Sequence, residues 1–395
     1  MSSISKKYSN HYDDMMMALL PLILCASVLF SARVLLICGT AMVTARIVDV
    51  AMAVLRHQEI DTDDKSSTVA ALTFCMMLPV SIPLYVVIMS VALTVLVGKH
   101  AFGGKDAYPF SLAALAMCVA AVNWPTEVFK AVKPFSAVDF WTGAAQSAAS
   151  SSLQIKTGGL PYISTLNLLL GNHAGAMGSG FIIIIAAIAF FLLMSKRVSW
   201  HVPVTFLVTC SAIAVAFPRI YGVSRIDSLK YEILTSAIIF YAVFMLNEPA
   251  TTPKKPQAKI IFGFLCGVLT MLFRYFGSFE VGGCFALLLV NATEGYWDRL
   301  FAGKSDKQEK PEEKPAAEEK VPEKKVYRKA EDKSSEPVKH KKADTTKEKD
   351  LSATRTLDII SRAEDDIDQV EFSTQTIDVR EALKAFDEMY NKEGR

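Results

Sequence analysis

Long apolar segments separated by short polar or basic stretches fill the first three quarters of the chain. A membrane-spanning helix needs roughly 20 apolar residues, and fewer where the helix is broken or shielded by protein. Ten segments meet this description, at residues 15–30, 34–55, 68–78, 83–97, 110–122, 181–194, 202–217, 231–246, 259–276 and 281–296. The pattern predicts an all-α polytopic membrane protein with about ten transmembrane helices.

Composition divides the chain into three parts. Residues 1–303 hold the predicted spans and a long, less apolar loop at 123–180, whereas residues 304–350 alternate Lys and Glu with Pro and Ala. The latter composition is typical of a disordered, charged linker. Residues 351–395 carry apolar side chains near helical spacing and are predicted to form short amphipathic helices. This C-terminal tail either docks on a partner or the membrane surface, or is a solvated tail with marginal helix.

Lysine and arginine residues indicate the orientation. They are more frequent in the loops on the side of the N-terminus, at residues 6–7, 56–65, 99–105, 196–197, 254–259 and 299–304, than in the opposing loops. Short, positively charged loops stay on the cytoplasmic side of a membrane. We therefore expect both termini to be cytoplasmic and the loop 123–180 to face outward. The formal net charge of +2 conceals this distribution.

A weak internal repeat indicates that the membrane domain is built from two halves. Leu93–Lys99 resembles Leu269–Arg274, and a glycine pair follows each stretch, at residues 103–104 or 282–283. Halves of five spans each would form two inverted repeats, which is a common plan for membrane proteins with a central site. The alternative is that two leucine-rich helices are alike by chance.

Proline and glycine interrupt several apolar segments. Such residues break helices, and the freed backbone N–H and C=O groups must be buried in protein or face a cavity. The positions concerned are Pro79, Pro83, Gly98, Gly103, Gly104, Pro249 and Pro253. Groups freed in this way can hold an anion, the edge of a flavin or a cation. The alternative is that these residues lie in ordinary loops between unbroken helices. Their occurrence in both halves favours a shared central site.

Seven blocks of sequence carry a resemblance to a known family. They are Ser66–Pro83, Gly98–Gly104 (GKHAFGG), Tyr108–Pro125, Leu169–Ser179 (LLGNHAGAMGS), Trp200–Leu207 (WHVPVTFL), Met245–Pro253 (MLNEPATTP) and Arg274–Ala292. In these blocks, and in their order, the chain resembles the RnfD/NqrB family, the membrane subunits of bacterial ion-translocating electron-transport complexes. The resemblance ends near residue 298 and does not include the tail.

The resemblance implies a location and a function. RnfD/NqrB proteins lie in the bacterial cytoplasmic (inner) membrane beside other Rnf-like subunits, which carry out the substrate oxidation. They help to couple electron transfer to the movement of Na⁺ or H⁺. We therefore expect a multi-pass subunit in a lipid bilayer that is non-catalytic or relays electrons. The resemblance also implies cofactor contacts in the first half, at Gly98, Lys99, Gly103, Gly104, Pro109 and Phe110.

The loop 123–180 holds the most informative departure from the family. Family members carry FMN through a phosphoester to a threonine, in a motif similar to Asp-x-x-(Ser/Thr)-(Gly/Thr)-Ala-Thr. The matching residues here are Asp139, Thr142, Gly143, Ala144 and Ala145. Because the methyl group of Ala145 has no oxygen, covalent FMN at position 145 is chemically excluded. Any flavin in this chain, FMN or riboflavin, is therefore expected to bind without a covalent bond at that position.

An oxygen-rich stretch follows the eighth predicted span. It contains Asn247, Glu248, Thr251 and Thr252. Glu248 stands where the family has an aspartate before proline, and a translocated Na⁺ needs several oxygen ligands. These four residues are the predicted ion path, and helix capping is the alternative. In the second span, Arg46 and Asp49 lie three residues apart and are expected to share a helix face and partly neutralise each other.

Other chemistry is scarce. All seven cysteines fall in apolar segments without C-x-x-C spacing, so neither a disulfide frame nor an iron–sulfur ligand set is indicated. We find no metal site, no hydrolytic constellation and no nucleotide-binding glycine loop, and we expect no nucleic-acid partner. Of the six histidines, only His100 and His173 lie in glycine-rich turns where a ligand could bind.

Two classes of function stay open. The first is a membrane subunit of an Rnf-like complex, which Glu248 and the broken helices favour. The second is a redox-inactive relative that works as a transporter, a channel or a membrane scaffold whose tail recruits partners, which Ala145 favours. We expect the chain to be a subunit of an Rnf-like complex. With respect to flavin chemistry, we expect it to be redox-inactive.

Overall fold

The computed structural model describes residues 3–301, apart from residues 60, 106, 157–158, 160–162, 196–197, 221 and 278–280. The predictions for residues 304–350 and 351–395 lie outside the described residues. The described part is helical, and its only β-pairings are three isolated bridges within the loop 123–180. This part of the structure confirms the prediction of an all-α protein.

Five main helices form the first half of the membrane domain. They are α1 Ser3–Leu29, α2 Arg33–Leu55, α3 Ser66–Met76, α4 Leu84–Leu93 and α5 Leu112–Asn123. Helix α4 continues directly into a π-helix, η1 Thr94–Lys99, and then into a 3₁₀ turn, η2 His100–Phe102. The loop that follows contains the short helices α6 Pro125–Val128, α7 Ser151–Lys156 and α8 Thr165–Leu169.

The second half has a similar sequence of helices. They are α9 Ile182–Met194, α10 His201–Ala216, α11 Arg225–Leu234, α12 Ile238–Phe240, the π-helix η3 Tyr241–Met245, α13 Pro256–Phe276, α14 Gly282–Asn291 and α15 Glu294–Leu300. A π-helix thus occurs in each half. π-Helical turns are rare and are frequent at functional sites.

The lengths of these helices agree with a multi-pass membrane protein. Four helical segments are long and apolar enough to cross a membrane: His11–Leu29, Arg33–Leu55, Leu84–Phe102 and Pro256–Phe276. A fifth candidate runs from α11 to η3 and is bent by 62°. The other predicted positions hold the shorter apolar helices α3, α5, α9, α10 and α14. A helix of ten residues is about 15 Å long, half of a hydrocarbon core of about 30 Å.

Apolar side chains cover much of the outside of the helices. Val28 on α1, Ile47 on α2 and Phe190 on α9 are each more than 60% exposed, at 76%, 61% and 67%. Large apolar side chains exposed on several helices are expected where a protein contacts lipid or a partner. The family's expected location in a membrane is consistent with these exposed faces.

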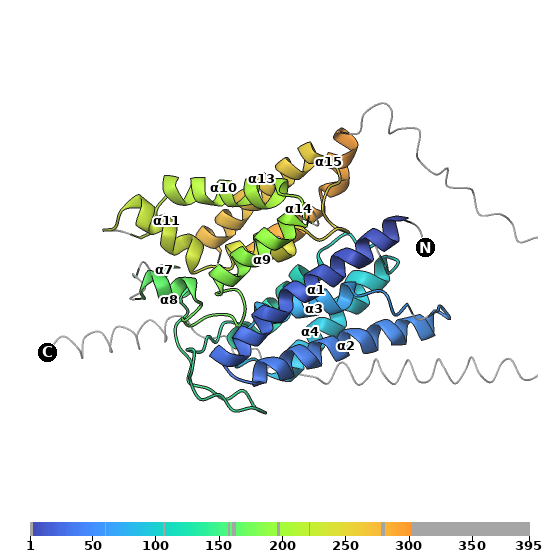
Figure 1. The fold of residues 1–395 in the computed structure, drawn as a ribbon, viewed down its shortest axis with the longest axis horizontal. Helices are drawn as coiled ribbons and strands as arrows, with labels where there is room; N and C mark the ends of the chain where they lie inside the picture. The colour runs from blue at the N-terminus through green and yellow to red at the C-terminus, as the bar shows by residue number, and fades with distance from the viewer. Residues whose placement is uncertain are drawn as a thin grey trace, which may run out of the picture. The chain divides into compact units, whose positions relative to one another are not determined.

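The centre of each half is a helix without any exposed face. Every residue of α3 is buried, and so is every residue of η3. Helix α3 packs against α1, α2 and α5, and η3 packs against α10 and α12. Figure 1 shows α1–α4 and α9–α15 as two groups side by side, and contacts of α1 with α9 and of α5 with α14 join them.

Two glycines bring α13 against α10. A Cβ atom at Gly263 would lie 2.1 Å from Thr205 Oγ1, and one at Gly267 would lie 2.8 Å from Thr209 Cβ. Small residues four positions apart let helices approach closely in a membrane, where apolar burial gives little driving force. This G-x-x-x-G spacing lets α10 and α13 pack closely in the second half.

Buried polar contacts define two ends of the bundle. At one end, called here the Lys99 end, Lys99 at the end of η1 contacts Asp49 on α2 and Asp64 before α3. At the other end, called the Arg33 end, Arg33 at the start of α2 contacts the backbone between α3 and α4. Consecutive helices of the first half therefore run in alternating directions between the two ends.

Candidate functional site

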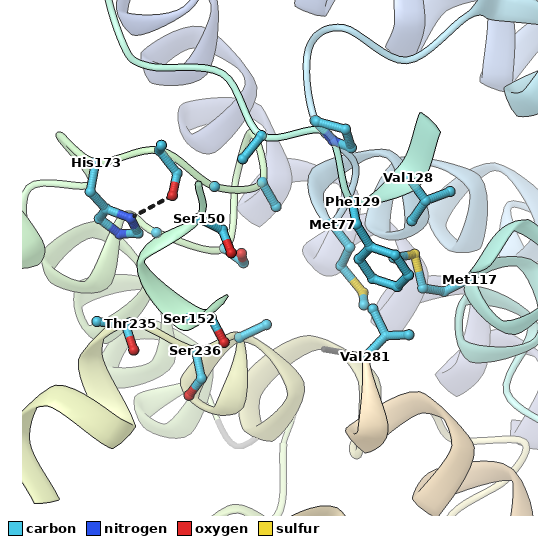
Figure 2. A pocket seen from close by; sticks show the side chains of 18 of the residues that line it. Met77, Met117, Val128, Phe129, Ser150, Ser152, His173, Thr235, Ser236 and Val281 are labelled. Carbon is cyan, nitrogen blue, oxygen red and sulfur yellow. Dashed lines mark hydrogen bonds between the residues drawn. The ribbon is translucent and has the colours of Figure 1, made fainter. Parts of the chain in front are cut away.

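A cavity of about 80 Å³ lies at the Arg33 end, where the broken helices of both halves meet (Figure 2). Met77 and Pro79 reach it from the break between α3 and α4. Thr235, Ser236 and Ala237 reach it from the bend between α11 and α12. Discontinuous helices of two repeats commonly meet at the binding site of membrane transporters.

The glycine turn before α9 satisfies the backbone that the first break leaves open. The N–H of Met177 donates to Leu78 O at 2.8 Å, and the N–H of Gly178 donates to Met76 O at 2.8 Å. A Cβ atom at Gly178 would lie 2.5 Å from the sulfur of Met76, so only glycine allows this approach. The freed backbone groups are thus buried in protein, as a broken helix in a membrane requires.

The cavity has a polar wall and an apolar wall. Figure 2 shows the polar side chains on one side, from His173, Ser150, Ser152, Thr235 and Ser236. The opposite side is formed by Met77, Met117, Phe129 and Val281. A pocket divided in this way suits a ligand with one apolar side and one side that forms hydrogen bonds.

Two polar atoms of the lining are buried without a hydrogen-bond partner among the described residues, His173 Nε2 and Arg274 Nη2. Burial lowers the pKa of His173, which favours its neutral form. The other nitrogens of Arg274 are engaged: Nε donates to the carboxylate of Glu232, and Nη1 donates to Ser152 Oγ at 3.1 Å. Unpartnered buried polar groups are uncommon and indicate room for a water or a ligand.

The residues of the altered flavin motif form a tight turn, and none of them lines this cavity. Asp139 Oδ1 accepts hydrogen bonds from Trp141 N, Thr142 N and Thr142 Oγ1. Thr142 Oγ1 in turn accepts from Ala144 N at 3.2 Å. The hydroxyl that remains in the motif therefore holds the turn together. Ala145 is paired with Val138, just before Asp139, and its methyl group packs partly against the core.

Arg33 fastens this turn to the broken helix. Its side chain is fully buried, and its Nε and Nη2 donate to Val80 O at 3.0 Å and Ile82 O at 2.8 Å. Its Nη1 donates to Phe140 O at 2.7 Å. A guanidinium group can serve several acceptors at once because its N–H groups form a rigid fork. The arginine therefore replaces the helical hydrogen bonds that are missing at the break.

Gly143→Ala is expected to lower the free energy of unfolding by about 1–3 kcal/mol. Gly143 has φ +74°, and a Cβ atom there would lie 2.6 Å from Arg33 Nη2 and 2.8 Å from Ser81 O. Denaturant unfolding of the purified protein in detergent would measure the loss. Gly222→Ala is the matched control, since Gly222 has φ +81° and nothing within 4 Å of the added carbon. Equal losses in both variants would contradict the contact with Arg33.

The turn Gly98–Gly104 lies at the opposite end of the bundle from the motif. Lys99 is 1% exposed, and its Nζ lies 2.7 Å from Asp64 Oδ2, 2.7 Å from Ser67 Oγ and 3.2 Å from Asp49 Oδ1. His100 Nε2 lies 2.8 Å from the same oxygen of Asp49. Lys99 is thus the centre of a buried ion cluster that ties α2, α3 and η1 together.

The predicted cofactor contacts therefore form two separate groups. Gly103 and Gly104, with φ +114° and +93°, line a cavity of about 360 Å³ at the Lys99 end. Pro109 and Phe110 lie in the nearby loop before α5, where the ring of Phe110 meets that of Phe102 at 6.1 Å. The residues 139–145 lie at the Arg33 end. Sequence spacing implies no distance between these groups, and the structure does not bring them together.

Arg46 and Asp49 both line the cavity of about 360 Å³ at the Lys99 end, as residues on one helix face would, but the described residues show no ion pair between them. Arg46 Nη1 donates to Asp64 O at 2.7 Å, whereas Asp49 binds Lys99 and His100. Both side chains lie on α2, but their partners come from the loop before α3 and from the turn at the end of η1. Helical spacing shows which residues share a face and cannot show which distant groups reach that face first.

The predicted ion path follows η3 at the Lys99 end. Asn247 Nδ2 donates to Ala242 O at 2.7 Å, and Thr252 Oγ1 donates to Glu248 O at 2.7 Å. Thr251 is buried beside them. Two of the four predicted ligands therefore cap the backbone of their own turn, as the helix-capping alternative predicts.

Several residues at the two ends carry contacts that the sequence did not reveal. Glu232 on α11 pairs with Arg274 on α13, and the carboxylate of Glu248 accepts a hydrogen bond from Tyr108. Tyr108 also contacts Tyr12 of α1. An ionisable residue inside an apolar segment is itself a signal for function, and this signal was available for Glu232 and Arg274. No such signal marks the two tyrosines.

Comparison with known proteins agrees with the resemblance seen in the sequence. The D-type subunit of the ion-translocating oxidoreductase complex of Salmonella newport is 25% identical over 286 residues, which cover 64% of this chain and 81% of the relative. The D-type subunit of the proton-translocating ferredoxin:NAD(+) oxidoreductase complex of Clostridium ljungdahlii is 26% identical over 277 residues, 69% of this chain and 83% of the relative. A sequence model of the NQR2, RnfD, RnfE family matches residues 4–305, which include nearly every residue of the described helices. The chain therefore belongs to the NQR2, RnfD, RnfE family.

Proposed function

We propose that this protein is the membrane subunit of an Rnf-like complex that couples electron transfer to the movement of Na⁺ or H⁺ across a bacterial cytoplasmic membrane. The observation that carries the proposal is the cavity at which the broken helices of the two halves meet. The names of the relatives in Salmonella newport and Clostridium ljungdahlii support it, since both are subunits of ion- or proton-translocating complexes. Substrate oxidation would belong to other subunits, and this chain would be non-catalytic or would relay electrons.

The packing of the helices supports ten crossings in two inverted halves. In the first half α4 packs against α2 and α5, and in the second half α13 packs against α10 and α14. Ten crossings would place the N-terminus and the end of α14 on the same side of the membrane. Because the basic loops occur at the Lys99 end, we infer that this end is cytoplasmic and that the loop 123–180 faces outward.

The residues present do not fit the covalent FMN of the family. Ala145 has no oxygen, and the hydroxyl of Thr142 both donates and accepts within its turn. The cavity of about 80 Å³ is smaller than the roughly 300–1,000 Å³ of pockets that enclose larger ligands. We therefore propose that the chain works without covalent flavin. A non-covalent FMN or riboflavin would require this cavity to open.

Purification of the tagged full-length chain from native membranes in a mild detergent tests the proposed complex. We expect further membrane subunits and electron-transfer subunits to co-purify in a constant ratio, as mass spectrometry would show. A multi-subunit membrane complex of the same cells serves as the control for the detergent. If that complex stays intact while this chain is isolated alone, the proposal fails and the transporter, channel or scaffold alternative takes its place.

The proposal for flavin predicts a dark wild-type band when the denatured protein is viewed on a gel for flavin fluorescence. Ala145→Thr, co-expressed with a flavin transferase, is expected to give a fluorescent band, because the Asp139 turn that precedes the acceptor is intact. Ala145→Val is the matched control, since valine has the shape of threonine without its hydroxyl. A fluorescent wild type would contradict the proposal. A dark Ala145→Thr protein would mean that the loop has lost its recognition by the transferase.

A further inference from the structure

Three residues far apart in the sequence are linked by consecutive hydrogen bonds at the Lys99 end, and together they form a hydrogen-bond chain. Tyr12 comes from α1, Tyr108 from the loop before α5, and Glu248 from the turn after η3. The two hydroxyl oxygens lie 2.7 Å apart, and Tyr108 Oη lies 2.9 Å from Glu248 Oε1. Because Tyr108 has one hydroxyl proton and donates it to the carboxylate, Tyr12 must donate to Tyr108. The hydrogen bonds therefore all donate in one direction, from Tyr12 on α1 toward Glu248.

This hydrogen-bond chain borders a small cavity. Its volume of about 20 Å³ is enough for one water molecule. The side chain of Ser111 lines it and is fully buried. Its titratable lining residues are His11, Tyr12 and Glu248, and no lysine, arginine or aspartate among the described residues lines it. The cavity thus offers a place for a water beside the carboxylate.

The surroundings of Glu248 are poorly arranged for a sodium ion. Carbonyl oxygens of an unwound helix often supply Na⁺ ligands in transporters. Here Ala242 O accepts from Asn247 Nδ2, while Leu246 O and Glu248 O both accept from Thr252 Oγ1. The remaining amide oxygen of Asn247 has no partner among the described residues but does not line the cavity. A carboxylate that takes a proton from a hydroxyl needs no such set of ligands.

We propose that Glu248 takes up a proton, not a sodium ion, and that Tyr12 and Tyr108 deliver it. The inference rests on the proposed function for the role of Glu248 in the ion path, and it names the ion. In the transfer, Glu248 takes the hydroxyl proton of Tyr108, Tyr108 takes that of Tyr12, and Tyr12 takes one from a water molecule, which leaves a hydroxide ion in the solvent. Each hydroxyl loses and gains one proton, so one positive charge moves to the carboxylate and no electron is transferred.

Infrared spectroscopy of the purified full-length chain tests this proposal. The C=O stretching band of protonated carboxyl groups is recorded while the pH is raised, and subtraction of the Glu248→Gln spectrum isolates the band of Glu248. We expect a band that the variant lacks and that disappears at high pH. Absence of this band from the lowest to the highest pH at which the protein stays folded would overturn the proposal.

Two conservative variants test the tyrosines. Tyr108→Phe keeps the ring and removes the donor to the carboxylate, so the band of Glu248 should shift in frequency and lose half its intensity at a higher pH. Tyr12→Phe should slow the exchange of the Glu248 proton with deuterated water. Tyr85→Phe, on an exposed tyrosine of α4, is the control and should change neither property. If all three variants match the wild type, the tyrosines do not deliver the proton.

Replacement of choline chloride by sodium chloride distinguishes the two ions. A sodium ion bound at Glu248 would compete with the proton and lower the pH of half-loss by about one unit for each tenfold rise in its concentration. We expect no shift, and a shift of this kind would make Glu248 a sodium ligand. The experiment uses the isolated chain. A sodium-dependent shift would therefore show that the ion at Glu248 is sodium, and it would not affect the result of the co-purification experiment.

Discussion

Replacement of Arg33 by alanine is expected to lower the free energy of unfolding by about 3–6 kcal/mol. The guanidinium group is 0% exposed and donates to three backbone carbonyls, those of Val80, Ile82 and Phe140. A buried acceptor that loses its donor costs about 1–3 kcal/mol. The variant therefore leaves both the broken helix and the turn 139–145 without their common partner. Unfolding in mixed detergent micelles would measure the loss.

Two further variants serve as comparisons. Arg33→Lys keeps the charge, but a single ammonium group cannot reproduce the planar fork of the guanidinium, so its loss should lie between those of wild type and Arg33→Ala. Arg225→Ala removes an exposed arginine at the start of α11 and should change stability by less than about 0.5 kcal/mol. A stable Arg33→Ala protein would show that water can satisfy these carbonyls and that Arg33 is not needed at the break.

The helices could be predicted because their signal is local. A helix lies at each of the predicted spans, and the segment 231–246, predicted as one span, is the bent pair of α11 and α12 with η3. Proline and glycine also marked the right joints: the segment after Met77 is broken, and the glycine turn 169–180 packs against it. These features depend on residues close together in the sequence, where hydrophobic pattern and backbone restrictions decide the structure.

The contacts between distant segments could not be predicted in the same way. Arg33 lies in a short polar interruption that is typical of a hairpin loop, yet its partners are 47, 49 and 107 residues away. Helical spacing pairs Asp49 with a neighbour on its own helix, yet it meets Lys99. A long basic side chain can reach several elements, so its sequence position does not determine its partner. Buried charges are strongly constrained by the fold, and a single sequence does not carry that information.

The two ends of the bundle nevertheless share a plan that the internal repeat indicates. The repeated stretches end at Lys99 in the first half and at Arg274 in the second. Each of these cations is buried and paired with a carboxylate of another helix, Lys99 with Asp49 and Arg274 with Glu232. One pair lies at the Lys99 end and the other at the Arg33 end. Related contacts at opposite ends are what two inverted halves would produce, and they support that part of the proposed architecture.

Arg274→Met is expected to lower the free energy of unfolding by about 3–5 kcal/mol, because it leaves a buried carboxylate without its main partner. Glu232 is 2% exposed, and among the described residues its carboxylate would keep one ion pair, with Arg219, whose Nε lies 3.8 Å away. Removal of the carboxylate as well should relieve the cost. Arg274→Met combined with Glu232→Met is therefore expected to be more stable than Arg274→Met alone. Arg219 would keep its hydrogen bond from Nη1 to Arg274 O and its stacking on the ring of Tyr275.

A double-mutant cycle built on denaturant unfolding in detergent would separate charge from packing at this cavity. The coupling energy between positions 232 and 274 is expected to be about 1–3 kcal/mol, as for charged groups in direct contact. Ser152→Ala is the matched control, because it removes a neutral acceptor of the same guanidinium and leaves the carboxylate in place. Its coupling to Arg274 should be smaller. If the loss of unfolding free energy in the double variant equals the sum of the losses in the two single variants, it arises from packing around the cavity. The ion pair between Glu232 and Arg274 would then not be what holds α11 to α13.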